Sequence, residues 1–285
     1  MLKQFIKELY QIWITERPNQ LAAALAYFGM FSFAPIIFVA FSVVGLFADE
    51  ISAANQFYQR LENVLGAEVA TLIQDSITTL SKPSTGGSIL VSIISFLALL
   101  YAASGVFFQL QFALNTIWHV PPPKKGQTMA FIRQRLFSFL MVIGIGLLGI
   151  LAVLTNLLLA WFGALTERLL GISASMSLAA GAAALVLITI AFALFYKILP
   201  ETKVAWRDVW LGAAIAALLV LTAVTLAGLF FQLSSLSSAF QAAGAFSVLL
   251  IGFNYIAQIF LLGALICRVY ANRFGSRRLT LEQEL

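Results

Sequence analysis

The chain has 285 residues, of which 61% are hydrophobic and only 10% are charged, and its formal net charge is +5. In a soluble domain about a quarter of the residues are charged, so this composition excludes an ordinary soluble protein and predicts one embedded in a membrane. Cys267 is the single cysteine, which excludes an intramolecular disulfide.

Residues 1–20 precede the first long apolar run and predict an amphipathic interfacial helix. Polar residues, among them Lys3 and Lys7, occupy one side of this helix. We expect it to lie on the cytoplasmic leaflet, either as a lipid-sensing paddle or as an anchor that sets the angle of the first span. The apolar stripe consists of Leu2, Phe5, Ile6, Leu9 and Trp13.

Six apolar runs follow, and each exceeds the roughly 20 residues that a helix needs to cross the hydrocarbon core of a bilayer. Backbone polar groups must be satisfied within each span, which predicts helices. The expected fold class is therefore all-α: a polytopic membrane protein with a six-helix transmembrane domain over 21–268 and a cytoplasmic tail over 269–285. The expected spans are 21–47, 89–117, 137–162, 177–198, 209–231 and 246–268.

The distribution of basic residues predicts the orientation. Of the 17 Lys and Arg residues, all except Arg60, Lys82 and Arg168 fall on one side of the predicted membrane. Because positively charged loops stay in the cytoplasm, both termini are predicted to be cytoplasmic. The tryptophans lie at or just beyond span ends, as in an aromatic belt: Trp13, Trp118, Trp161, Trp206 and Trp210.

Residues 51–80 form the one sizeable segment predicted on the external side. Residues 57–65 and 72–80 each carry an apolar stripe at helical spacing, and Gly66 lies between them. They predict two amphipathic helices, which either cap an outward-facing cavity or rest on the outer leaflet.

Two of the expected spans carry polar residues that align on one helix face. Polar groups in lipid need partners, so both faces are predicted to turn inward. There they line a shared cavity or hydrogen-bond neighbouring helices together. The cavity or substrate-binding candidates are Tyr101, Ser104, Gln111 and Asn115 in the second span, and Ser247, Asn254, Tyr255 and Gln258 in the sixth.

Basic residues gather at the predicted cytoplasmic rim of the spans. They either attract anionic headgroups or snorkel to the membrane surface as topology signals. No carboxylate falls in the middle of an expected span, so we expect no buried proton relay. The rim cations are Arg133, Arg135, Lys197, Lys203 and Arg207.

Pro35 lies inside the first expected span. A proline within a helix removes one backbone hydrogen bond and clashes with the preceding turn, so a kink or hinge is predicted there.

Several short motifs occur in order along the chain. The first span holds Leu-Ala-Ala-Ala-Leu-Ala-Tyr at 21–27 and Ser-Phe-Ala-Pro at 32–35. Further motifs are Ala103-Ser104-Gly105, 114–118, 133–136, Tyr196-Lys197-Ile198-Leu199-Pro200, 206–209 and Gly212-Ala213. Together they resemble the YihY/BrkB membrane family over nearly the whole chain, which implies a protein of the bacterial cytoplasmic membrane. Where that family has an acidic residue after Gly-Ala, this chain has Leu265.

The resemblance and the polar helix faces favour a transporter or flippase of a lipid or amphiphilic solute. The alternative is a non-transporting scaffold or envelope-assembly factor that binds an envelope protein or forms a homo-oligomer. The family has also been labelled a ribonuclease, but a metal-dependent nuclease needs clustered His and carboxylate ligands, and His119 is the single histidine. We therefore expect no enzyme activity, catalytic residue, metal, cofactor or nucleic-acid partner, and we expect membrane lipids as partners.

Overall fold

The computed structural model describes residues 2–45, 58–59, 62, 70–71, 74–75, 98, 101, 104–121, 144, 155, 176–233 and 242–276. Its elements are all helices, and the described residues contain no strand, which confirms the all-α class. The helices are α1 (Leu2–Glu16), α2 (Pro18–Gly45), α6 (Gly105–Ile117), α8 (Met176–Ile198), α9 (Trp206–Leu233) and α10 (Ala242–Arg273).

Three described helices are long and apolar enough to cross a membrane: Gly181–Ile198 in α8, Trp206–Ala227 in α9 and Leu249–Arg273 in α10. They coincide with the expected fourth, fifth and sixth spans. α2 covers most of the first expected span, and α6 covers the last part of the second. Most of 137–162 and of the external segment 51–80 lies outside the described residues, so the count of six spans and the orientation of the termini stay predictions.

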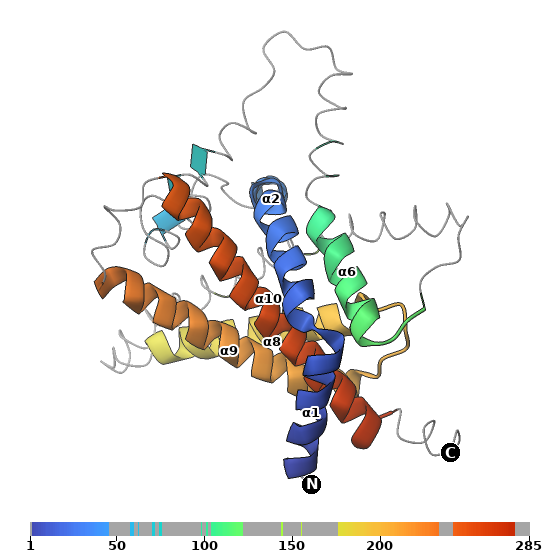
Figure 1. Ribbon diagram of the computed structural model, residues 1–285. Helices are drawn as coiled ribbons and strands as arrows, with labels where there is room; N and C mark the ends of the chain where they lie inside the picture. Colours follow the sequence, from blue (N-terminus) through green and yellow to red (C-terminus); the bar gives the residue numbers. More distant parts are fainter. Residues whose placement is uncertain are drawn as a thin grey trace.

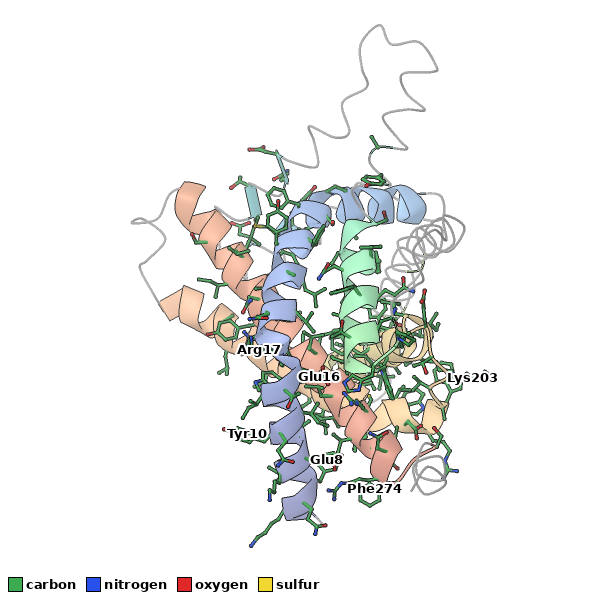
Figure 2. All side chains as sticks on the ribbon, turned by 45° about the vertical axis from the view of Figure 1, so that its right-hand side comes forward. Glu8, Tyr10, Glu16, Arg17, Lys203 and Phe274 are labelled. Atoms are coloured by element: carbon green, nitrogen blue, oxygen red, sulfur yellow. The ribbon has the colours of Figure 1, made fainter. Side chains whose placement is uncertain are left out.

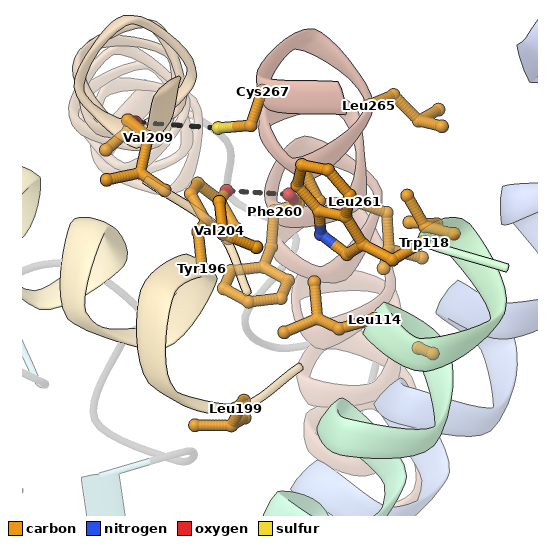
Figure 3. Close-up of a cluster of buried hydrophobic side chains, with 14 of the residues drawn as sticks. Leu114, Trp118, Tyr196, Leu199, Val204, Val209, Phe260, Leu261, Leu265 and Cys267 are labelled. Atoms are coloured by element: carbon orange, nitrogen blue, oxygen red, sulfur yellow. Dashed lines mark hydrogen bonds between the residues drawn. The ribbon is translucent and has the colours of Figure 1, made fainter. Parts of the chain in front are cut away.

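α10 is the central helix, and it contacts each of α1, α2, α6, α8 and α9. Figure 1 shows it running diagonally between the α2–α6 pair and the α8–α9 pair. Its buried side chains meet those of α6 and α8 in one apolar cluster (Figure 3), in which Leu114, Tyr196 and Leu261 are fully buried. Leu265, at the position where the resembling family has an acidic residue, is also fully buried in this cluster.

Tyr196 brings a polar group into this cluster, and its hydroxyl donates a 2.7 Å hydrogen bond to the Phe260 carbonyl. The bond crosses from α8 to α10, as the dashed line in Figure 3 shows. A buried hydroxyl without a partner would cost a few kcal/mol, so this bond fixes the position of α8 against α10.

Two glycines bring α9 and α10 into close contact. A Cβ atom on Gly212 would lie 2.3 Å from the Gly263 carbonyl oxygen, and a Cβ atom on Gly263 would lie 2.3 Å from the Tyr196 hydroxyl. Real Cβ atoms do not approach other atoms so closely, and small residues at helix crossings are the usual device for close packing in membranes. The separation of α9 and α10 therefore depends on glycine at both positions.

The helix predicted at residues 1–20 is present as α1. Pro18 has no N–H to continue α1, and Arg17 adopts a left-handed conformation with φ of 46°, so the chain breaks between α1 and α2. Leu9 and Trp13 of the predicted stripe pack against the core, whereas Ile6 of the same stripe is exposed. Figure 1 shows α1 lying beside the end of α10; its place on a leaflet stays a prediction.

Pro35 lies inside α2 and is buried. Figure 2 shows that α2 changes direction in its second half, the half that contains this proline. Hinge motion at Pro35 stays a prediction.

Candidate functional site

The predicted polar face of α6 points partly toward the connection between α8 and α9. The Gln111 side chain is only 5% exposed, and its Nε2 donates a 3.3 Å hydrogen bond to Glu201 Oε1. Asn115 Oδ1 accepts a 2.9 Å hydrogen bond from the Glu201 backbone N–H. Both amides therefore bind the same residue of the connection. These two bonds join α6 to the turn that follows α8.

At the start of the same face, the Ser104 hydroxyl finds its hydrogen-bond partner three residues earlier in the chain. Ser104 is fully buried, and its hydroxyl donates to the Tyr101 carbonyl at 2.8 Å. The Tyr101 side chain is exposed. Of the four candidates on this span, Gln111 and Asn115 therefore bond to Glu201, whereas the buried Ser104 bonds to its own chain segment and the Tyr101 side chain is exposed.

The polar residues of α10 bond along their own helix. Gln258 Nε2 donates a 2.7 Å hydrogen bond to Asn254 Oδ1, one helical turn earlier, and both side chains are partly buried. Ser247 and Tyr255 are exposed. The two amides of α6 thus bond to Glu201, whereas the two amides of α10 bond to each other. That these two groups line one cavity stays a prediction.

The described rim cations differ in burial. Lys197 is partly buried and donates to the Val204 carbonyl, so it helps to close the connection between α8 and α9. Lys203 and Arg207 are exposed on and beside that connection. Arg133 and Arg135 lie outside the described residues.

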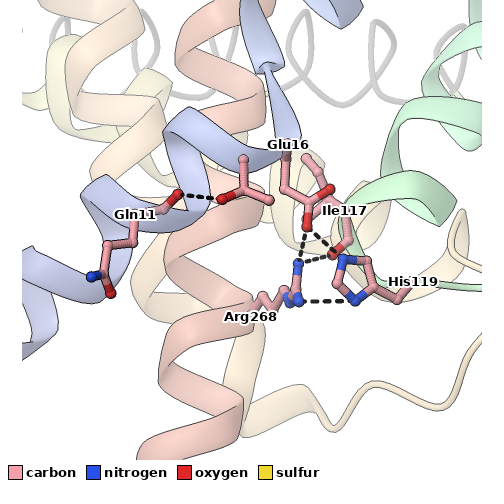
Figure 4. A network of polar contacts seen from close by, with 6 residues as sticks. Gln11, Glu16, Ile117, His119 and Arg268 are labelled. Atoms are coloured by element: carbon pink, nitrogen blue, oxygen red, sulfur yellow. Dashed lines mark hydrogen bonds and ion pairs between the residues drawn. The ribbon is translucent and has the colours of Figure 1, made fainter.

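Sequence reasoning missed a charged network at the junction of α1, α6 and α10 (Figure 4). Arg268 Nη1 donates to Glu16 Oε1 at 3.0 Å and to the Ile117 carbonyl at 2.7 Å. Its Nη2 contacts His119 Nδ1 at 3.1 Å, and His119 Nε2 contacts the same Glu16 oxygen. The Arg268 and Glu16 side chains are only 14% and 12% exposed. The network therefore holds three helix ends together with a largely buried ion pair.

The geometry of this network selects one form of the histidine. A guanidinium can only donate, so His119 Nδ1 must be the acceptor of the Arg268 contact and carries no proton. The proton of a neutral ring is then on Nε2, where it can be donated to the Glu16 carboxylate. A neutral His119 thus satisfies both neighbours at once.

His119 also ends α6. The His119 N–H bonds to the Thr116 carbonyl at 3.1 Å, and the Val120 N–H bonds to the Asn115 carbonyl at 2.9 Å. These two bonds form a Schellman motif, whose left-handed position usually holds glycine, and His119 occupies it with φ of 53°.

This strain gives a first prediction. We expect His119→Gly to be about 1 kcal/mol more stable than His119→Ala, because both lose the same side-chain contacts while only alanine keeps the left-handed strain. Heat unfolding of the purified proteins in one detergent measures the difference. Equal midpoints would contradict the left-handed conformation of this residue.

Among the described residues, no group of three or more His, Cys, Asp and Glu side chains could hold a metal ion.

Comparison with known proteins shows that a family model described as "Virulence factor BrkB" matches residues 9–284. The chain belongs to the BrkB family. This match includes all of the ordered motifs, and it confirms the resemblance.

Relatives of this BrkB-family chain are named as UPF0761 membrane proteins. The relative from Azotobacter vinelandii is 28% identical over 278 residues, which is 94% of this chain and 64% of the relative. One from Pseudomonas aeruginosa is 26% identical over 283 residues, or 96% of this chain and 65% of the relative. The chain thus spans just under two thirds of the length of these relatives. No solved structure matches it.

Proposed function

We propose that this membrane protein moves a lipid or an amphiphilic solute across the bacterial cytoplasmic membrane. The observation that carries the proposal is the position of Gln111, a long amide that is almost fully buried in an apolar bundle and bonds to Glu201, a residue of a polar connection. A helix that serves only as a span gains little from such a group, because leucine would pack there without needing a partner.

In the proposed mechanism, the substrate passes along the polar faces of α6 and α10, and the two bonds from α6 to Glu201 close one end of this route. The bond from the Gln111 amide to the Glu201 carboxylate is worth about 1.5–3 kcal/mol net and the bond from Asn115 to the backbone about 1 kcal/mol, so both can break and re-form during a transport cycle. An entering headgroup would replace Glu201 as the partner of Gln111 and Asn115. Membrane lipids or a related amphiphile are the proposed substrates, and no residue is assigned a catalytic role.

Transport of a fluorescent phospholipid in reconstituted vesicles tests this function. We expect wild-type protein to move the label between leaflets faster than protein-free vesicles do. The variant Gln111→Leu, Asn115→Leu, Gln258→Leu should be at least tenfold slower. Thr222→Val, Thr225→Val is the matched control, because these hydroxyls donate to carbonyls of their own helix, those of Leu218 and Leu221.

A second candidate function is a scaffold for envelope proteins or for a second copy of this chain. The bond between Gln258 and Asn254 favours it, because amides that satisfy each other need no substrate. If wild type moves no phospholipid above the protein-free rate while the chain captures an envelope protein, the scaffold function replaces transport.

A further inference from the structure

α1 has two different faces. Both of its acidic residues lie on the inner face, which packs against α10. Glu8 pairs with Arg273 and Glu16 pairs with Arg268, both on α10. Leu9, Ile12 and Trp13 pack on the core between these two ion pairs. Two ion pairs, with apolar contacts between them, therefore hold α1 against α10.

The outer face of α1 is apolar and positively charged. Ile6, Tyr10 and Ile14 follow one another at intervals of four residues and are 56%, 64% and 57% exposed. Lys3 and Lys7 are also exposed. Since a helix advances about 100° per residue, these five side chains share roughly a third of its circumference. Figure 2 shows Tyr10 on the side of α1 opposite to Glu8.

α1 lies near the end of a candidate membrane span. A single residue, Arg17, separates the end of α1 from the start of α2. The two arginines that hold α1 lie at the end of the apolar segment Leu249–Arg273. α1 thus lies at the level where a membrane-crossing segment ends, which is the level of lipid headgroups.

We propose that this outer face binds anionic lipid headgroups, and we name it the α1 lipid face: Lys3, Ile6, Lys7, Tyr10 and Ile14. The lysines supply charge for the phosphates, the isoleucines enter the acyl boundary, and the tyrosine suits the level between them. A bilayer is favoured over an acidic protein because α1 is joined directly to α2, so the lipid surface is always within reach. This inference does not depend on transport.

The full-length protein in mild detergent, titrated with phosphatidylglycerol or phosphatidylcholine and followed by native mass spectrometry, tests this face. We expect wild type to prefer phosphatidylglycerol. Lys3→Gln, Lys7→Gln should lower that preference about thirtyfold, because each of the two basic residues near an anionic surface contributes about 1 kcal/mol.

A charge-relocated variant separates this face from net charge. Lys3→Gln, Lys7→Gln, Gln4→Lys, Thr15→Lys keeps the total charge but moves it to two exposed positions on another side of α1. We expect it to behave like the double glutamine variant, with an unchanged unfolding midpoint. Wild-type preference in the relocated variant, or a protein dimer that the double variant abolishes, would overturn the proposal.

Discussion

Gly263→Ala is expected to lower the free energy of unfolding by about 3 kcal/mol, at the upper end of the usual cost of overpacking. The new Cβ would lie 2.3 Å from the Tyr196 hydroxyl, 2.8 Å from the Ala216 Cβ and 3.0 Å from the Gly212 carbonyl oxygen. Tyr196 cannot move away cheaply, because its hydroxyl is bonded to Phe260. Gly212→Ala should be as harmful, since its Cβ would meet the backbone of Gly263.

Gly252→Ala is the matched control, because it lies in the same helix and no described residue comes within 4 Å of the added Cβ. We expect this change to be neutral or to stabilise by up to about 1 kcal/mol through helix propensity. The midpoint of heat unfolding, followed by tryptophan fluorescence, measures both variants. Equal stability of the Gly263 and Gly252 variants would show that α9 and α10 are farther apart than described.

Arg268→Ala is expected to cost about 3 kcal/mol, because breaking a buried ion pair leaves its partner charge unpaired. Here the partner is Glu16, which is only 12% exposed, and the Ile117 carbonyl at the end of α6 also loses its donor. Arg268→Lys should rescue only part of the loss, because one ammonium group cannot reproduce the fork of contacts to Glu16, Ile117 and His119.

A double-mutant cycle with Glu16→Gln measures the coupling directly. We expect the double variant to be at least 1 kcal/mol more stable than the sum of the single changes predicts. Arg207→Ala provides a control arginine, since its exposed side chain should contribute less than about 0.5 kcal/mol. If Arg268→Ala were as mild as Arg207→Ala, the network would have no structural role.

The helices were predictable from sequence because length and apolar composition decide them. α8, α9 and α10 lie where unbroken apolar runs predict spans. α1 was predictable from its helical spacing, but the direction of its faces was not. Its apolar residues surround most of the helix, so the spacing alone did not tell that Leu9 faces α10 while Ile6 is exposed.

The contacts of the candidate site were harder to predict, because they join residues far apart in the chain. Glu16 and Arg268 are 252 positions apart, and Gln111 and Glu201 are 90 positions apart. A basic residue at a span end is usually a topology signal, so nothing in the sequence indicates that Arg268 forms a buried ion pair. By contrast, Asn254 and Gln258 were correctly placed on one helix face, because a separation of four residues is one turn.

Identification of the lipids that co-purify with the protein is the most direct test of the central claim that its polar residues hold an amphiphile. Wild type and the Gln111→Leu, Asn115→Leu, Gln258→Leu variant would be purified with native lipids and compared by mass spectrometry. We expect wild type to retain one amphiphile selectively and the variant to lose it. Bulk membrane lipids in ordinary proportions in both samples would contradict the claim and assign these residues to helix packing.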